Sequence, residues 1–587
     1  MGIVFAVALL ARLACQWQIA QWPILTHPVG DAASYLSWAE RIRDGQFWGD
    51  RPFYQAPLYP YFLAGVQSVI GSRLSDLRLV QAVMGAMSCV LLCIAGRRLV
   101  SPTTGLAAGL LLAIYPPAIF FDGLIQKTSL ALLLLCALLA VLSALPAARR
   151  WPTLLAAGAM TGLLGLTREN ALVLAAVILA WIWLGPLAAG RNRPAGRDEP
   201  APRGWLNGPF GARVAGAVSF TVGLGLILLP VALRNLAVGG EFALTTVQMG
   251  PNFYIGNHAG ATGRYVALQP GHESPPFERR DARRLAERAV GHPLSDKEVS
   301  RYWLGQSLDY ITDQPVQWIM LLGTKWCLVW NAYEIPDVES YVVHRQWSSL
   351  LGGLGRVFHF GILCPLAVCG VILGWPYRRR LALIYALTLA MAASVALFYV
   401  FGRYRFPLVP LLIIPAAAGI VEIARHLRAR TRTRTPRTHL ALTAGAVALT
   451  AVAANWPINP EAELNAMAYS NLGTVLAGQG DIDGAIKLFR RAVEGHPGSA
   501  EAHYNLGLAA ALTGDHSQAV RWFTRARQLN PNAVHVDYNL AVSLERTGQV
   551  DRAIEHYRRA MELDPTDDDA RRAVDRLLPT GDRHDPD

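Results

Sequence analysis

The sequence predicts an all-α protein in which a polytopic helical membrane region precedes a soluble helical solenoid, and three observations lead to this fold class. Hydrophobic residues make up 52% of the 587 residues, whereas charged residues make up only 16%. Apolar runs of the length needed to cross a bilayer recur from Met1 to about Ala454. After Trp456 the composition becomes that of a soluble domain, and a sequence repeat begins.

The apolar runs predict about eleven membrane spans. They lie at residues 1–19, 77–96, 103–120, 124–147, 153–167, 171–188, 213–233, 354–375, 381–401, 406–424 and 439–454. Lys and Arg gather in short loops, as is typical of the cytoplasmic side. These basic loops are Arg97–Arg98, Arg149–Arg150, 191–204, Arg378–Arg380 and 428–437. The stretch 314–330 is short, rich in Trp and contains Lys325, so we expect it to be interfacial or re-entrant.

With the N-terminus inside, this topology leaves three large pieces outside the membrane. They are the loops 21–76 and 235–316 and the segment after Trp456. The first apolar run starts almost at Met1, which is typical of an uncleaved anchor rather than a cleaved signal peptide. The Ala-, Arg- and Gly-rich composition is typical of a bacterial protein, for which the expected location is the inner membrane with these pieces in the periplasm.

The distribution of charge and cysteine excludes two other classes of protein. The formal net charge is +12, but the residues after 459 hold 14 Lys and Arg against 20 Asp and Glu. The basic excess therefore belongs to the membrane region and does not indicate binding of nucleic acid. All seven cysteines lie in apolar segments, so the sequence predicts neither a disulfide framework nor a cysteine metal site.

The C-terminal residues 461–578 repeat every 34 residues in the pattern of tetratricopeptide repeats. Five sets of positions recur three times: Asn471, Asn505 and Asn539; Gly480, Gly514 and Gly548; Ala485, Ala519 and Ala553; Phe489, Phe523 and Tyr557; and Pro497, Pro531 and Pro565. We expect three helical pairs, a capping helix and a polar tail at 579–587. Such arrays bind protein or peptide partners on a concave face, although a purely structural or oligomerising role remains open.

Asp31 is the first candidate for catalysis. It follows the first apolar run in GDAASYLSWAERI, Gly30 to Ile42, and begins a half-apolar helical pattern typical of a helix lying in the membrane interface. A carboxylate at this position could simply cap the helix. PLYPYFLAG, from Pro57, adds a second short apolar segment, and its Tyr59 is a candidate contact for the substrate. Two interfacial helices would therefore surround the acid.

A second acid and several arginines stand where the topology does not require charge. Asp122 lies at the external junction of the third and fourth spans, where a carboxylate is costly unless it serves a site. Arg168, Arg403 and Arg405 fall in external loops, and Arg12 lies inside the first span. They are candidates for binding an anion, although snorkelling or pairing with a local acid would also explain them.

The external stretch GPNFYIGNHAG, Gly250 to Gly260, has turn-forming residues around an aromatic pair. It predicts a loop that closes over a sugar, with Asn252, Tyr254 and Asn257 as candidate contacts, or else an ordinary structured loop. Glu334, in NAYEIPDVESY, is expected to be an exposed loop acid.

Taken in order, these motifs resemble a known family. GDAASYLSWA, PLYPY, the acid at Asp122, RNLAVGGEF with GPNFYIGN, and RYRFPLVP from Arg403 are together similar to the polyprenyl-phosphate-dependent glycosyltransferases of the C superfamily. Within that group, the protein O-mannosyltransferases and the aminoarabinose-transferase-like enzymes are the most similar. The resemblance covers residues 6–423. A tetratricopeptide tail on such a core also resembles the tetratricopeptide-bearing O-mannosyltransferases.

The resemblance implies an inverting transfer at the external membrane surface from a sugar linked to polyprenyl phosphate. Asp31 matches the family's general base, which deprotonates an acceptor hydroxyl on a protein, lipid or glycan. Arg403, Arg405 and Arg168 would bind the donor phosphate. Asp122 matches the family's second acid only loosely, because Gln126 and Lys127 stand where members often carry Glu. A divalent metal, for which Asp31 and Asp122 would be the ligands, is therefore left open.

Two alternatives remain at this point. An oligosaccharide ligase of the O-antigen-ligase type also combines many spans with tetratricopeptide tails, but it would place its key Arg and His residues in a large late loop. A non-enzymatic membrane scaffold would use only the repeats and would not need Asp31.

Overall fold

The structure is a computed structural model that describes residues 1–20, 23–26, 28, 30–145, 150–184, 209–240, 242–269, 275–337, 339–428, 437–564 and 568–578. Its regular elements over these ranges are all helices, which confirms the all-α fold class. The polar tail 579–587, Pro565 and the basic loop 191–204 lie outside the described residues.

The chain divides into two compact units. One consists of residues 1–20, 28–337 and 345–458, and the other of residues 21–27, 338–344 and 459–587. The first unit ends at Ile458, and the domain bounds at 456 and 461 stay a prediction. The sequence did not indicate that 21–27 and 338–344 belong to the second unit. Their described parts include two short helices, α2 (Pro23–Thr26) and α16 (Tyr341–His344), and both contact the first repeat helix, α23 (Glu461–Gly478).

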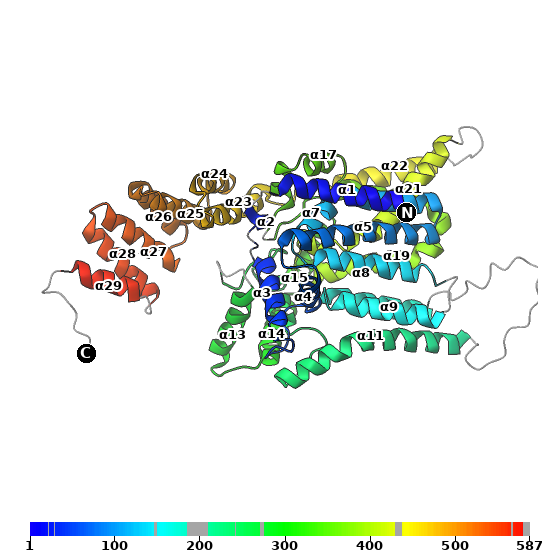
Figure 1. Cartoon of the computed structure of the whole chain (residues 1–587), viewed down its shortest axis with the longest axis horizontal. Coiled ribbons are helices and arrows are strands. Elements are labelled where there is room, and N and C mark those ends of the chain that lie inside the picture. The colour runs from blue at the N-terminus through cyan, green and yellow to red at the C-terminus, as the bar shows by residue number, and fades with distance from the viewer. Residues whose placement is uncertain are drawn as a thin grey trace, which may run out of the picture. The chain divides into compact units, whose positions relative to one another are not determined.

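The membrane-spanning part of the first unit is a bundle of apolar helices. Consecutive neighbours in space are α1 (Gly2–Ile19), α5 (Leu74–Leu99), α8 (Thr128–Leu142), α9 (Arg150–Gly165) and α11 (Pro209–Gly239), which lie side by side in Figure 1. The other half of the bundle is built by α6 (Pro102–Ala113), α7 (Pro116–Gly123), α10 (Val173–Leu184), α18 (Phe360–Leu373), α19 (Arg378–Leu397), α21 (Leu408–Arg428) and α22 (Arg437–Ala454). In this half α18 packs on α21 and α22, and α10 packs on α19.

The predicted count of about eleven spans is not confirmed. Six of the described helices are long and apolar enough to cross a membrane, and a seventh crossing results if α6 and α7 form one span bent by 53°. The bend falls at Ile114–Tyr115, directly before Pro116 and Pro117, because proline at the start of a helix cannot donate to the preceding turn. Three further apolar helices, Thr128–Leu142, Glu169–Leu184 and Ala441–Ala454, are shorter than 18 residues.

The remaining helices of the first unit, some polar and some apolar, lie between these helices in sequence. They are α3 (Gly30–Arg43), α4 (Leu58–Val69), α12 (Met249–Gly256), α13 (Pro275–Val290), α14 (Asp296–Asp313), α15 (Pro315–Trp330), α17 (Ser349–Val357) and α20 (Gly402–Arg405). The described residues also form 3₁₀ turns at Glu169–Leu172, Arg345–Trp347 and Trp375–Tyr377. α3 packs on α4, as expected for two short helices around Asp31. The stretch 314–330 forms the single helix α15, and its relation to the membrane stays a prediction.

The second unit confirms the tetratricopeptide solenoid. Antiparallel helices pair as α23 with α24 (Ile482–Gly495), α25 (Ala500–Leu512) with α26 (His516–Leu529), and α27 (Val534–Arg546) with α28 (Val550–Leu563), and α29 (Asp568–Leu577) packs on α28. The repeating glycines Gly480, Gly514 and Gly548 all adopt positive φ, between 77° and 85°, at the turn within each pair. Glycine is favoured there because a left-handed backbone strains other residues. The repeating alanines and aromatic residues are buried between the helices.

Candidate active site

Asp31 lies in the first turn of α3 and is almost completely buried, with 8% of its surface exposed. The chain enters this helix through Gly30, whose φ of +57° requires a residue without a side chain. Both carboxylate oxygens accept hydrogen bonds from side chains. Oδ1 accepts from Gln55 Nε2 at 3.0 Å, and Oδ2 accepts from Arg403 Nη1 at 2.5 Å. Among the described residues, the hydrogen bonds of this carboxylate therefore come from side chains of other segments and not from the backbone of its own helix.

Arg403 connects the carboxylate to a second acid. Its Nη2 lies 2.6 Å from Asp337 Oδ2, and its Nη1 also donates to Gln126 Oε1 at 3.0 Å. Arg403 is itself buried on the short helix α20. One guanidinium thus joins segments that are far apart in the sequence, namely the start of α3, the turn before α8 and the loop before α16. Such a bridge between two carboxylates fixes the orientation of all three charges.

The charge around Asp31 keeps it ionised. Burial raises the pKa of this carboxyl group, but the positive charges of Arg403 and Lys127 lower it more, together with hydrogen bonds from Arg403 and Gln55. The pKa of Asp31 therefore lies below its ordinary value, and the group is a carboxylate near neutral pH. A carboxylate held this way can accept a proton once its strongest partner moves away.

Two more cations accompany Arg403. Lys127 is buried and lies close enough to Asp31, Glu169 and Arg168 to interact with them electrostatically. Arg168 donates to Thr128 Oγ1 at 3.0 Å and lies over the ring of Tyr404 at 5.7 Å. Burial, and next the positive charge of Arg403, lower the pKa of Arg168 to about 10. The site thus concentrates positive charge in a place from which water is largely excluded.

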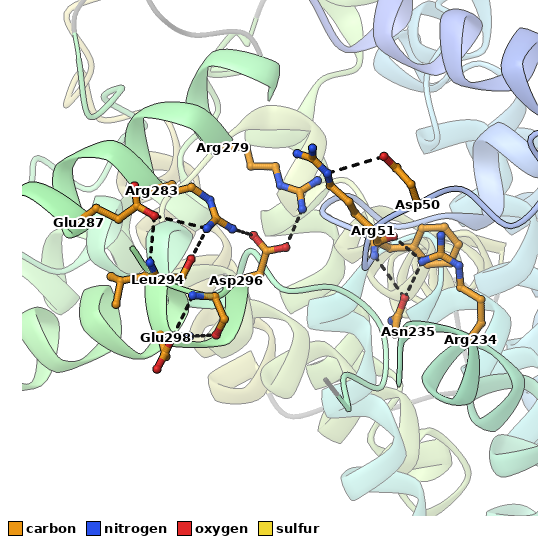
Figure 2. A network of polar contacts seen from close by, with 12 residues as sticks. Asp50, Arg51, Arg234, Asn235, Arg279, Arg283, Glu287, Leu294, Asp296 and Glu298 are labelled. Carbon is orange, nitrogen blue, oxygen red and sulfur yellow. Dashed lines mark hydrogen bonds and ion pairs between the residues drawn. The ribbon is translucent and has the colours of Figure 1, made fainter. Parts of the chain in front are cut away.

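The loop that carries Gln55 is fastened by the RN pair of the RNLAVGGEF motif (Figure 2). Arg234 Nη1 donates to the carbonyl of Arg51 at 2.7 Å, and its guanidinium lies 3.8 Å from the centre of the Phe53 ring. Asn235 Oδ1 accepts from the backbone N–H of Phe53 at 3.2 Å, while its amide donates to the carbonyl of Thr245 at 3.0 Å. The motif therefore positions the residues just before Gln55 and contributes no group to the site.

Arg405 is not brought to Asp31, although the sequence places it two residues after Arg403. Its Nη2 lies 3.0 Å from Glu334 Oε1, and Nη1 donates to the carbonyl of Asn331. The guanidinium also lies 4.1 Å from the centre of the Phe360 ring. The expectation that Glu334 is exposed is wrong, because 91% of it is buried against this arginine. Arg405 thereby holds the loop that leads to Asp337.

Asp122 pairs with Arg12 and not with the residues around Asp31. Its Oδ2 lies 2.7 Å from Arg12 Nε, and both side chains are buried, at 1% and 0% exposure. Arg12 additionally donates to the carbonyl of Ala8 at 3.0 Å. The two charges that the sequence singled out separately thus neutralise each other between α1 and α7, which is the ordinary way to keep ions in an apolar bundle.

Most of the predicted substrate loop is a helix. Residues Met249–Gly256 form α12, and the glycines that suggested turns serve close packing. A Cβ on Gly250 would lie 1.9 Å from the carbonyl oxygen of Ser300, and one on Gly256 would lie 2.2 Å from that of Phe398. Sequence patterns alone do not distinguish such contact glycines from turn glycines.

The side chains expected to contact a sugar are mostly engaged in packing. Asn257 Oδ1 accepts from Lys325 Nζ at 2.9 Å and from Trp318 Nε1 at 3.0 Å. Asn252 accepts from the Tyr399 hydroxyl at 3.3 Å, and Tyr254 stacks on His258 with ring centres 5.0 Å apart.

Tyr59 is completely buried and donates to Gln81 Oε1 at 2.5 Å. Its ring packs edge-on against Tyr35 of α3, with ring centres 5.3 Å apart. Tyr59 thus supports the helix that carries Asp31.

Gln55 and Asp337 had no sequence signal that distinguished them from other loop residues. In the sequence, Lys127 and Gln126 stand out only because they differ from the family pattern. Among the described residues, no group of three or more His, Cys, Asp and Glu side chains is arranged to hold a metal ion. Asp122, which would have completed a pair of metal ligands with Asp31, bonds to Arg12. The donor set around Asp31 therefore does not fit a divalent metal.

Comparison with known families is informative for both parts of the chain. Residues 50–192 match the model of the dolichyl-phosphate-mannose-protein mannosyltransferase family, and residues 470–534 and 514–568 match the tetratricopeptide repeat. These matches confirm the resemblance indicated by the motifs. The chain joins a mannosyltransferase-like membrane region to tetratricopeptide repeats. The family points to a membrane glycosyltransferase, and the apolar helices to an integral membrane protein.

Three solved structures similar to this chain cover a fifth to a quarter of it. The first tetratricopeptide domain of Spaghetti (RPAP3), bound to an HSP90 peptide, is 18% identical over 20% of this chain and 91% of that chain, with a TM-score of 0.19. The Arabidopsis OM64 domain is 18% identical over 20% and 96%, with a TM-score of 0.20. MamA is 24% identical over 25% and 84%, with a TM-score of 0.19. No curated protein matches the chain.

Proposed function

We propose that the protein is an inverting glycosyltransferase that moves a sugar from a polyprenyl-phosphate donor to an acceptor hydroxyl at the external face of the membrane. The observation that carries this proposal is the contact of 2.5 Å between Asp31 and Arg403, with Lys127 and Arg168 beside it. A base for a hydroxyl and a set of cations for a phosphate are the two requirements of this reaction. The match to the mannosyltransferase family supports the same chemistry.

In this mechanism Asp31 acts as the general base. One of its oxygens removes the proton of the acceptor hydroxyl while the hydroxyl oxygen forms a bond to the anomeric carbon of the sugar. The bond from that carbon to the phosphate oxygen breaks, and its electron pair stays on the phosphate. Attack from the side opposite to the phosphate inverts the configuration. General base catalysis of this kind contributes roughly 10²–10⁴-fold to the rate.

The cations of the site stabilise the charge that develops on the departing phosphate. The Nε atoms of Arg168 and Arg403 are buried without a hydrogen-bond partner among the described residues. A buried unsatisfied donor is costly, so a phosphate oxygen that accepts from it is bound favourably. Positive groups fixed in place before the reaction act most strongly where water is excluded.

Donor binding also prepares the base. In the structure Asp31 and Asp337 share the guanidinium of Arg403. When a phosphate takes up part of that guanidinium, the carboxylate of Asp31 loses part of its stabilisation and its pKa rises toward neutrality. The base therefore becomes stronger when the donor is in place, which limits futile proton uptake by the empty site.

The tetratricopeptide unit is proposed to recruit a protein or peptide partner, either the acceptor or another enzyme of the cell envelope. In a bacterium the proposed location is the inner membrane, with Asp31 and the repeats on the periplasmic side. The lipid chain of the donor would lie among the membrane helices.

The test compares Asp31→Asn with the matched control Glu40→Gln in purified protein reconstituted in lipid vesicles with polyprenyl-phosphate mannose. Glu40 is an exposed acid on the same helix. We expect Asp31→Asn to fold normally and to lose at least about 100-fold in transfer rate, whereas Glu40→Gln keeps full activity. Unchanged transfer by Asp31→Asn would contradict the mechanism. Failure of the unmodified protein to consume any polyprenyl-phosphate sugar would favour the scaffold alternative.

A further inference from the structure

Glu278 is a carboxylate near the site that the proposed mechanism does not use. It lies in the first turn of α13, is partly buried and accepts a hydrogen bond from the hydroxyl of Tyr265. The ring of Tyr265 is itself fixed between Tyr399 and Phe401, with ring centres 5.4 Å and 5.7 Å away. The aromatic cluster therefore holds Glu278 through one hydroxyl, and no ion pair with another described residue neutralises it.

A chain of contacts places the start of α13, where Glu278 lies, beside the loop that carries Gln55. Its neighbour Arg279 lies 2.7 Å from Asp296 Oδ2 and 5.6 Å from the centre of the Tyr54 ring. Figure 2 shows Arg279 and Arg283 of α13 converging on Asp296, which fixes the start of α13 against α14. Tyr54 directly precedes Gln55, the residue that donates to Asp31. In addition, α13 contacts α3.

The charged groups that act on Glu278 are those of Asp31, Asp337 and Arg403. Burial is the largest influence and raises the pKa of Glu278 to about 7, while the Tyr265 hydrogen bond lowers it. The negative charges of Asp31 and Asp337 raise it further, and the positive charge of Arg403 lowers it. Asp31 and Glu278 therefore differ in character, because the first is held as a carboxylate and the second exchanges protons near neutral pH.

Resting on the proposed function, we propose that Glu278 receives the proton that Asp31 removes from the acceptor hydroxyl and releases it to solvent. Each transfer leaves one proton on Asp31, and that proton must leave before the next hydroxyl can be deprotonated. Asp31 has little exposure of its own and is surrounded by cations, so a second carboxylate with access to water gives the proton a path. The relay changes no bond other than O–H bonds, because Asp31 returns to its carboxylate and Glu278 becomes a carboxylic acid that then deprotonates.

Two hydroxyl groups that interact with Glu278, those of Tyr54 and Tyr265, are poor substitutes for this role. Burial, and next the negative charge of Glu278, raise the pKa of Tyr54 above its ordinary value, so it does not ionise near neutral pH. Tyr265 donates its hydroxyl proton to Glu278 and orients the carboxylate. Arg279 is held by Asp296 and acts as a positioning residue for the first turn of α13.

The test uses Glu278→Gln in the full-length protein in vesicles with polyprenyl-phosphate mannose, with Glu298→Gln as control. Glutamine keeps the acceptor for Tyr265, and Glu298 is an exposed capping residue of α14 for which glutamine is an equivalent cap. We expect kcat to fall about tenfold in Glu278→Gln, KM for the acceptor to stay unchanged, and added imidazole to restore kcat. Imidazole is chosen because its pKa near 7 lets it carry the proton in place of the carboxylate.

Unimpaired kcat in Glu278→Gln, or a loss that imidazole does not restore, would overturn the relay. A full loss in Asp31→Asn together with an unimpaired Glu278→Gln would overturn the relay alone, whereas full transfer by Asp31→Asn would overturn the proposed function as well.

A measurement without turnover provides a separate check. In infrared difference titration, Glu278→Gln should remove a carboxyl band that titrates near pH 7. Asp31→Asn should shift that titration to lower pH, because removal of a neighbouring negative charge favours the ionised form. An unshifted titration would show that the two carboxyl groups are not coupled and would likewise overturn the relay.

Discussion

Arg403 donates to Asp31 at 2.5 Å across 372 residues of sequence. The contact unites the first polar helix after α1 with the short helix between α19 and α21. Neither segment has a reason to meet the other in an unfolded chain, so the site exists only when the membrane helices have assembled. The same guanidinium holds Asp337, so the geometry of the site also depends on the position of the loop after Asn331.

Arg403→Gln should raise the pKa of Asp31 and impair transfer strongly. The pKa of this carboxyl group lies below its ordinary value in the folded protein, so the ionised form persists as pH falls until that lowered pKa is reached. Without the cation, the acid limb of the kcat/KM profile should move to higher pH, and transfer at neutral pH should fall about 100-fold. Arg403→Lys, which keeps the charge but not the two-sided bridge, should move the limb less. An acid limb that stays in place in Arg403→Gln would contradict the pairing.

The fold class and the repeats could be predicted because both depend on local patterns. Apolar runs and the recurrence of Gly480, Gly514 and Gly548 are written in the sequence. The count of about eleven spans is not confirmed, because helix length and the bend before Pro116 depend on how the helices pack.

The ion-pair partners of the buried arginines could not be predicted in the same way. Arg403 and Arg405 are two residues apart, yet one pairs with Asp31 and Asp337 and the other with Glu334. A helical turn directs their side chains differently, and only the assembled fold determines which acid each one meets. Asp122 looked like part of the site for the same reason, since the sequence does not show that Arg12 lies beside it.

The Arg12–Asp122 pair should contribute to folding and not to chemistry. Asp122→Asn leaves Arg12 as a buried cation without its counter-ion, which should destabilise the protein by about 3–5 kcal/mol. The double variant Arg12→Met with Asp122→Leu should recover most of that loss, because two apolar groups replace two neutralised charges. Thermal unfolding in detergent, together with the transfer rate of the folded fraction, checks both statements. A double variant that is stable but inactive would show that the pair has a role in the transfer reaction.

The glycines of α12 should be sensitive to a single added methyl group. In Gly250→Ala the new Cβ would lie 1.9 Å from the carbonyl oxygen of Ser300, so α12 must move away from α14. We expect a loss of about 1–3 kcal/mol in stability, measured by thermal unfolding. Gly305→Ala on α14 is the matched control, because nothing lies within 4 Å of its new Cβ and alanine favours the helix by about 0.5–1 kcal/mol. Equal stability of the two variants would argue against the close contact and in favour of the loop predicted from sequence.

Asp537 should stabilise the tetratricopeptide unit without affecting the transfer reaction itself. It is completely buried on α27, where Oδ1 lies 2.7 Å from His556 Nδ1 and 3.0 Å from Arg527 Nε, so it ties α27 to both neighbouring helices. In Asp537→Asn the charge that holds these donors is lost, and unfolding of the repeats should become easier by about 1–3 kcal/mol. Asp551→Asn, an exposed acid on α28, is the control. Limited proteolysis of the full-length protein should then cleave the repeats of Asp537→Asn faster, while transfer to a small hydroxyl acceptor stays at the level of the unmodified protein. A parallel loss of that transfer would mean that the repeats contribute to the chemistry and not only to recruitment.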